Sequence, residues 1–208
     1  MRFLKFSVHP PYPPLPNPRN LFFFAVFVNF LGQFFYIRSV VWGGTKPNLV
    51  SWFIWMLAPF IGVFFQLKAG AGLSVLPVFM AGFGPLLVII FSVLNKNSYW
   101  KLYTFDIYCG LFSFLSLVLY VFTHNLGISI LFAIVSDGLA AVPTIIKSWK
   151  FPETESASIY LTGIFSNIAG LFIIKNWIFS IYSFGIYFIL LNLIIVFCIY
   201  RKKIFKIH

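Results

Sequence analysis

The sequence has few charged residues: Asp, Glu, Lys and Arg make up 9% of its 208 residues, and only four are acidic. A soluble domain covers its surface with charge and contains roughly 25% charged residues. Apolar residues instead make up 61% of the chain. A large part of the surface must therefore face a solvent that tolerates apolar groups, and the composition predicts a membrane protein.

A strict alternation of polar and apolar residues, the pattern of a transmembrane barrel strand, is also missing. The apolar residues form long uninterrupted runs. In hydrocarbon, a helix satisfies its backbone hydrogen bonds within its own segment. The sequence therefore predicts an all-α membrane protein.

Residues that commonly carry catalysis or bind metals are scarce. The histidines, His9, His124 and His208, show no metal-ligand spacing, and no glycine-rich phosphate loop precedes a helix. Cys109 and Cys198 lie within apolar runs, which is typical of buried structural thiols. We expect no enzyme activity, no catalytic residue, no metal site and no cofactor.

The net charge of +11 does not indicate a nucleic-acid partner. The basic residues lie at the ends of the apolar runs and form no single stripe. Lys and Arg in such positions usually set membrane topology. We expect the lipid bilayer and a small polar solute as partners, no nucleic acid, and we leave a homo-oligomer open.

Seven apolar runs approach the roughly 20 residues that cross a bilayer. They are Leu21–Val41, Ser51–Leu67, Leu73–Leu94, Phe105–Phe122, Leu126–Ile146, Ser156–Ile174 and Trp177–Tyr200. The preceding residues, 1–20, are rich in proline and lack the apolar core of a secretory signal, so we expect an uncleaved, extended tail.

The loops between these runs differ in basic charge. With seven spans, the side that holds the N-terminus carries five Lys and Arg residues and the other side ten. The positive-inside rule then places the C-terminus in the cytosol and the N-terminus outside. We expect a multi-pass protein of the cell membrane, in a bacterium the inner membrane.

An internal repeat relates the two halves of the chain. A shift of 105 residues places the first three spans on the last three, with Pro47 on Pro152 and Ser51 on Ser156. Each proline stiffens the chain before a helix, and each serine is placed to cap the first turn. Parallel repeats of this kind are a transporter architecture with the substrate site at their interface.

The predicted organisation is therefore two parallel three-helix repeats joined by a linker helix. It comprises a tail at 1–20, a first repeat at 21–94, a linker at 95–125, a second repeat at 126–200 and a basic cytosolic tail at 201–208.

The end of the fifth span reads Pro143-Thr144-Ile145-Ile146-Lys147-Ser148-Trp149-Lys150, followed by Pro152 and Ser156. This segment and the three-plus-one-plus-three arrangement resemble the SWEET sugar transporters and the wider PQ-loop superfamily. Those proteins close a helix with a Pro-Gln pair, continue through a basic turn, and begin the next helix at a serine. Pro143-Thr144 and Arg38-Ser39 occupy the places of the two pairs, so both dipeptides are absent here.

The resemblance implies transport by rocking about prolines within the spans. Pro59 and Pro143 match two of the family's hinge positions, while the first and sixth spans contain no proline at theirs.

Asp137 is the most informative candidate for a substrate site. It lies near the middle of the fifth span, and an ionisable side chain at that depth usually faces a cavity or a partner. Its repeat equivalent is Gly32, beside Gln33, so an acid and an amide would lie near the pseudo-axis. We interpret Asp137 as a substrate acceptor or a proton-coupling site; a structural tie to a serine or helix end is the alternative.

Other polar and aromatic residues in the spans extend this candidate site. Asn167 and Asn192 supply amides, although the Gly163-x-x-x-Asn167-x-x-Gly170 pattern also suits helix packing. Trp55 and Tyr160 are repeat equivalents that could sandwich a ring, although such residues also gather at membrane interfaces.

We therefore expect a transporter or facilitator of a small polar solute, sugar-like or vitamin- and nucleoside-like, that alternates access between two repeats. The predicted substrate-binding residues are Asp137, Gln33, Asn167, Asn192, Trp55 and Tyr160. The alternative is a non-transporting PQ-loop-like membrane receptor or assembly factor, favoured by the missing hinge prolines and the basic ends.

Overall fold

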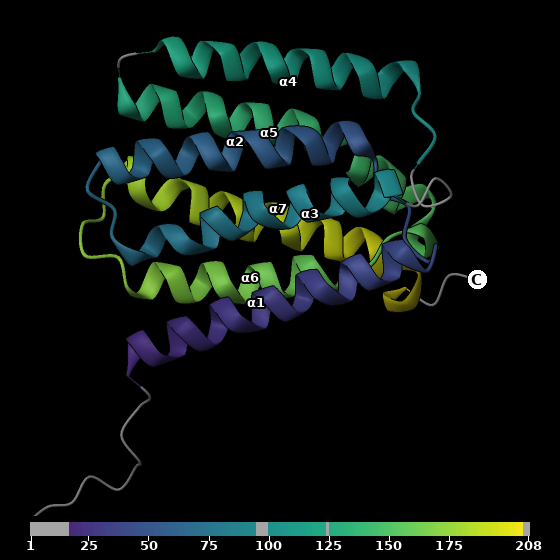
Figure 1. Ribbon diagram of the computed structural model, residues 1–208, viewed down its shortest axis with the longest axis horizontal. Coiled ribbons are helices and arrows are strands. Elements are labelled where there is room, and N and C mark those ends of the chain that lie inside the picture. The colour runs from purple at the N-terminus through teal and green to yellow at the C-terminus, as the bar shows by residue number, and fades with distance from the viewer. Residues whose placement is uncertain (1–16, 95–99, 124, 206–208) are drawn as a thin grey trace, which may run out of the picture.

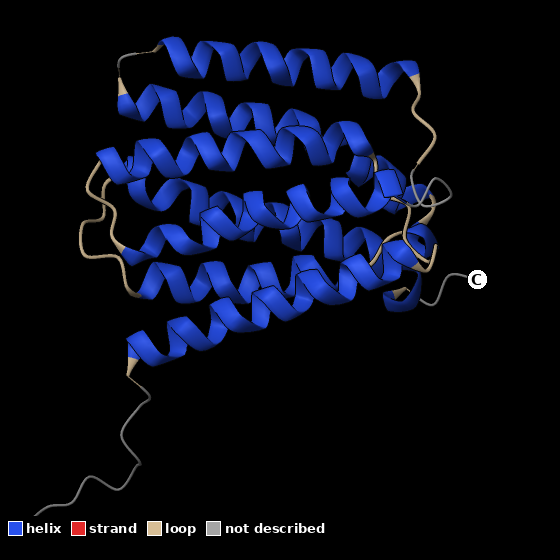
Figure 2. Ribbon diagram, in the orientation of Figure 1, coloured by secondary structure: helices blue, strands red, loops and turns tan. Residues whose placement is uncertain are grey.

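The structure is a computed structural model that describes residues 17–94, 100–123 and 125–205. All regular secondary structure in these ranges is helical, as Figure 2 shows. The α-helices are α1 (Pro18–Val41), α2 (Leu49–Lys68), α3 (Leu76–Leu94), α4 (Thr104–Phe122), α5 (Leu126–Lys150), α6 (Ser158–Phe172) and α7 (Phe179–Ile204). Two short 3₁₀ turns, η1 (Leu73–Val75) and η2 (Pro152–Thr154), precede α3 and α6.

Five of these elements are long and apolar enough to cross a membrane: α1, α2, the η1–α3 unit, α5 and α7. The predicted sixth span, Ser156–Ile174, contains a helix of only 15 residues, because its first two and last two residues lie outside α6. At 1.5 Å per residue, α6 is about 22 Å long. The apolar stretch of α4 is also shorter than in the five. The chain is thus a helical, multi-pass membrane protein.

The helices run back and forth in sequence and form a bundle (Figure 1). In the first half, α3 packs against both α1 and α2; in the second half, α7 packs against both α5 and α6. Between the halves, α1 contacts α6 and α2 contacts α5. Helix α4 lies at one edge, against α5 and α2. The centre of the bundle is therefore the junction between the first three and the last three helices.

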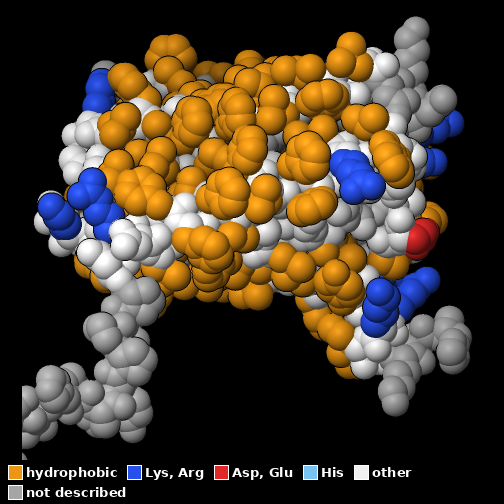
Figure 3. Space-filling view, turned by 60° about the horizontal axis from the view of Figure 1, so that its bottom comes forward, with side chains coloured by type: hydrophobic (Ala, Val, Ile, Leu, Met, Phe, Trp, Pro, Cys, Tyr) orange, Lys and Arg blue, Asp and Glu red, His pale blue; other side chains and the backbone are white. Residues whose placement is uncertain are grey.

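On the face shown in Figure 3, apolar side chains cover the middle, and Lys and Arg gather toward the two ends. On α1, for example, Phe24, Phe27 and Phe34 are each more than half exposed. Large exposed apolar side chains in the middle band are costly in water but favourable in lipid. The surface thus agrees with the membrane prediction.

The predicted serine caps are wrong. Helix α2 begins after Asn48, whose Oδ1 accepts hydrogen bonds from the backbone of Val50 (3.2 Å) and Ser51 (3.5 Å). Ser51 itself lies inside the helix. Helix α6 begins after Ala157 without a side-chain cap, and the Oγ of Ser156 instead lies 3.1 Å from that of Ser158. Asparagine is among the best N-caps, so Asn48 replaces the serine in that role.

Candidate functional site

A cavity of about 60 Å³ lies at the junction of the two halves. Helices α1, α2 and α3 line it from the first half, and α5, α6 and α7 from the second. All of the predicted substrate-binding residues lie on its wall: Asp137, Gln33, Asn167, Asn192, Trp55 and Tyr160. These six predicted residues lie on five different helices, and the fold brings them together at one place.

Asp137 lies in the interior of α5 and is fully buried. One carboxylate oxygen, Oδ2, accepts a hydrogen bond from the hydroxyl of Tyr187 on α7 (2.8 Å). The backbone carbonyl of Asp137 accepts another from Nε1 of Trp55 (3.2 Å). The second carboxylate oxygen, Oδ1, is buried and has no partner among the described residues. Among the described residues, Asp137 therefore keeps one unpaired acceptor inside the bundle.

The amides of Gln33 and Asn167 also leave one buried oxygen each without a described partner. Nε2 of Gln33 donates to the backbone carbonyl of Met80 (2.9 Å) and to Oδ1 of Asn29 (3.0 Å). Nδ2 of Asn167 donates to the carbonyl of Gly163 (2.9 Å). A backbone carbonyl can only accept, so each amide is oriented with its nitrogen on that carbonyl. The two atoms left without a described partner, Oε1 of Gln33 and Oδ1 of Asn167, are therefore hydrogen-bond acceptors.

Asn192 lies beside Gly163, across the α6–α7 contact. A Cβ atom at Gly163 would lie 2.8 Å from Nδ2 of Asn192, so a larger residue there would displace the amide. The glycine pattern of α6 thus serves helix packing and the cavity wall together. Gly170, further along, faces Pro77 of α3.

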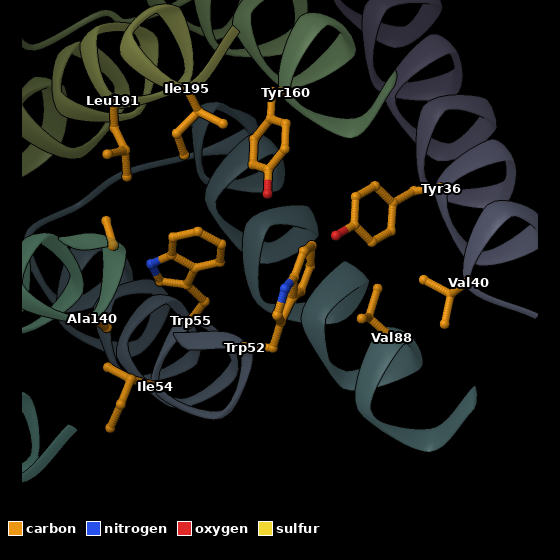
Figure 4. Close-up of a cluster of buried hydrophobic side chains, with 11 residues drawn as sticks. Tyr36, Val40, Trp52, Ile54, Trp55, Val88, Ala140, Tyr160, Leu191 and Ile195 are labelled. Atoms are coloured by element: carbon orange, nitrogen blue, oxygen red, sulfur yellow. The ribbon is translucent and has the colours of Figure 1, made fainter. Parts of the chain in front are cut away.

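Aromatic side chains on the cavity wall belong to a buried cluster (Figure 4). The sequence suggested that Trp55 and Tyr160 could sandwich a ring, but in the structure they do not. Their ring centroids are 6.5 Å apart at an interplanar angle of 77°, an edge-to-face contact, so a solute ring does not fit between them. Tyr36 and Trp52 extend the cluster, with ring centroids 4.9 Å apart.

Beyond this cluster lies a buried polar network that the sequence analysis missed. Oε1 of Glu155 accepts hydrogen bonds from the hydroxyls of Tyr36 (2.5 Å) and Tyr160 (3.2 Å). Its Oε2 forms an ion pair with Lys147, whose Nζ also donates to the backbone carbonyl of Lys46 (2.6 Å). Sequence reasoning treated Lys147 as a loop charge and did not select Glu155. The network ties together the α1–α2 and α5–α6 connections.

Two further lining residues, Trp52 and Asn29, were not among the predicted substrate-binding residues. Trp52 is buried, and its Nε1 has no described partner. Asn29 lies one helical turn before Gln33 on α1, and its side chain accepts from Gln33. The spacing of four residues places both on one helix face and could have identified Asn29.

The two predicted hinge prolines lie inside helices, Pro59 in α2 and Pro143 in α5. Pro85 is a third such residue, inside α3 and on the cavity wall. A proline inside a helix removes one backbone hydrogen bond and favours a kink. Whether these residues act as hinges stays a prediction.

At the other end of the cavity, a void of about 10 Å³ shares Pro77 and Asn167 with it. This void extends to Ser74 before α3 and to Ile174 after α6. It leads toward the end of the bundle opposite Glu155.

The ionisable side chains on the cavity wall are Asp137 and Tyr160; none of the described lining residues is Lys, Arg or His. The described residues also include no group of three or more His, Cys, Asp or Glu placed to hold a metal ion. Comparison of the chain with protein-family models, with curated proteins and with solved structures gives no match.

Proposed function

We propose that this chain is a membrane transporter or facilitator of a small polar solute, which it carries by alternating access between two three-helix halves. The observation that carries the proposal is the cavity between the halves. It places buried polar atoms without described partners, on Asp137, Gln33 and Asn167, at the centre of an apolar bundle. A buried polar group that lacks a partner is costly, and in a membrane protein it usually marks a solute or ion pathway.

The packing of the helices supports the two-repeat part of this proposal. Exchanging α1, α2 and α3 with α5, α6 and α7 turns the α1–α6 contact into the α5–α2 contact and the α3–α6 contact into the α7–α2 contact, all of which occur. The contacts within each half also correspond. A pseudo-two-fold axis along the bundle would produce this pattern, with α4 as the linker.

The two ends of the cavity differ, as alternating access requires. The Glu155 network and the aromatic cluster close one end, and the smaller void extends from the other. The cavity volume of about 60 Å³ holds only a few water molecules. A sugar-sized solute therefore requires the halves to separate, and separation would break the bonds between Glu155 and Tyr36.

In this proposal α4 and α6 cross the membrane with the five longer elements, and the Glu155 end faces the cytosol. Basic residues support that orientation. Within the described residues, the Glu155 end holds Arg38, Lys46, Lys101, Lys147, Lys150, Arg201, Lys202 and Lys203, whereas the other end holds Arg19, Lys68 and Lys175. The positive-inside rule favours the richer end in the cytosol. The resemblance to SWEET and PQ-loop proteins agrees with this arrangement, in a cell membrane such as a bacterial inner membrane.

Counterflow into proteoliposomes tests the proposal. Liposomes preloaded with an unlabelled sugar, amino sugar or nucleoside should accumulate the same labelled compound for at least one member of the panel. Asp137→Asn should reduce that accumulation. Asp106→Asn is the matched control, because Asp106 lies in the first turn of α4, away from the cavity, where its Oδ2 accepts a hydrogen bond from the backbone N–H of Tyr103 (3.0 Å), and the side-chain oxygen of asparagine can accept the same bond. A wild-type protein that exchanges no member of the panel contradicts the proposal and leaves the receptor alternative.

A further inference from the structure

We propose that the solute is a small organic cation that carries hydrogen-bond donors, with Asp137 as its counter-ion. This inference rests on the proposed function and specifies its substrate class. It begins from the charge on the cavity wall, where Asp137 faces no Lys, Arg or His among the described lining residues.

The buried carboxylate lacks a cationic partner within the described residues. Tyr187 donates one neutral hydrogen bond to Oδ2, and Oδ1 has no partner. Lys147, further along the same helix, is held by Glu155 and by the carbonyl of Lys46. An ionised carboxylate in a low-dielectric site is strongly disfavoured unless a cation pairs with it. A cationic solute would supply that charge, and an anionic solute would be repelled.

The hydrogen-bonding atoms of the cavity lead to the same class. Three buried atoms without described partners are acceptors, namely Oδ1 of Asp137, Oε1 of Gln33 and Oδ1 of Asn167, whereas Nε1 of Trp52 is a donor. A ligand that satisfies them must present mainly N–H or O–H groups. An ammonium group or a hydroxylated cation does so, and a carboxylate or phosphate does not.

The aromatic wall is compatible with a positive charge. The rings of Trp52, Trp55 and Tyr160 line the cavity, with Trp55 held against the backbone of Asp137. The face of an aromatic ring attracts a cation, most strongly for tryptophan. A neutral sugar would also contact these rings, but it would leave the charge of Asp137 without a partner unless the carboxylate took up a proton.

Binding to the full-length, detergent-solubilised protein distinguishes a cationic from a neutral solute without requiring transport. Two matched pairs serve as probes: choline and 3,3-dimethylbutan-1-ol, in which carbon replaces the charged nitrogen, and glucosamine and glucose, in which a hydroxyl replaces the ammonium. Equilibrium dialysis should show that at least one cation binds about tenfold or more tightly than its neutral partner. Because the comparison uses the unaltered protein, it does not depend on how a variant folds.

Asp137→Asn should remove the preference for the cation, and Asp106→Asn should retain it. Equal or tighter binding of both neutral partners, or no binding of either cation, overturns the inference. So does a preference that survives Asp137→Asn. Counterflow of a neutral sugar without cation binding would refute the cationic substrate class but support the transporter proposal. Cation binding without counterflow would support the cationic class but contradict the transporter proposal.

Discussion

Tyr36 and Tyr160, from opposite halves of the chain, donate their hydroxyl hydrogens to the same oxygen of Glu155. Their rings also meet edge to face, with centroids 6.3 Å apart, and Figure 4 shows both hydroxyls directed into the space between them. One carboxylate thus joins α1 to α6 and, through Lys147, to α5. Any movement that separates the halves at this end must break the bond between Tyr36 and Glu155, because Glu155, Tyr160 and Lys147 all belong to the second half.

Removing the positive charge of Lys147 should strongly destabilise the fold. The side chains of Lys147 and Glu155 are 1% and 0% exposed, so Lys147→Met leaves a buried carboxylate without a counter-ion, at a cost of about 3–5 kcal/mol. The free energy of unfolding in mixed micelles, followed by helical circular dichroism, measures the effect. Lys150→Met, at the exposed end of the same helix, should change it by less than about 0.5 kcal/mol.

Combining Lys147→Met with Glu155→Gln should recover much of this loss, because the double variant buries no unpaired charge. If Lys147→Met alone is as stable as Lys150→Met, the ion pair does not stabilise this end of the bundle.

Opening the end of the cavity at Glu155 should follow from Tyr36→Phe with Tyr160→Phe. Both substitutions keep the aromatic rings and remove the hydroxyls that bind Glu155. A cysteine at Ile159 on the cavity wall, with Cys109 and Cys198 replaced by serine, reports the change. A membrane-impermeant thiol reagent applied at the Glu155 end should label this cysteine several-fold faster in the double phenylalanine variant. An unchanged rate would refute the role of Glu155 as a closure.

The α1–α6 contact should not tolerate a side chain at Gly32. A Cβ atom there would overlap the side chain of Thr162, so Gly32→Ala should cost about 1–3 kcal/mol through overpacking. Thr162→Ala in the same chain removes the overlapping hydroxyl and methyl and should recover part of the loss. Gly138→Ala is the control, because its Cβ would lie 3.6 Å from the Tyr187 hydroxyl, an ordinary contact. Unfolding in mixed micelles distinguishes the variants, and equal stability of both alanine variants would contradict the prediction.

Tyr187→Phe should lower the free energy of unfolding, because Asp137 loses a hydrogen-bond donor. The substitution keeps the ring but removes the 2.8 Å hydrogen bond to Oδ2, and a hydrogen bond to a charged group contributes about 1.5–3 kcal/mol. Tyr182→Phe, on the same helix, removes a hydroxyl that makes no hydrogen bond within the described residues, and it should leave stability unchanged. If both variants unfold at the same denaturant concentration, Asp137 does not depend on Tyr187.

Four of the six residues predicted to bind substrate were selected because hydrocarbon makes polar groups expensive, and all six line the cavity. Asp137, Gln33, Asn167 and Asn192 interrupt long apolar runs, and a polar side chain in such a run tends to face the interior. The sequence did not show that these residues share one cavity, because that depends on which helices are neighbours. The hydrogen bond from Gln33 to Met80, for example, joins residues that are 47 positions apart in the chain.

Local chemistry misled the prediction where a better partner lay nearby or far along the chain. Ser51 looked like a cap, but Asn48 lies one residue before the helix and takes that role. Trp55 and Tyr160 looked like two walls of a slot, but their rings contact each other. Glu155 drew no attention because its partners Tyr36 and Tyr160 are 119 and 5 residues away.

The sequence by itself determined that this chain is a helical membrane protein and where most of its helices lie. Apolar runs in hydrocarbon must satisfy their own backbone bonds, and that requirement is local. Tertiary structure alone decided that Asp137 and the amides share one cavity, that Lys147 pairs with Glu155, and that Tyr36 and Tyr160 bind the same oxygen of Glu155. These relationships depend on distances between helices far apart in the chain, which side-chain packing sets.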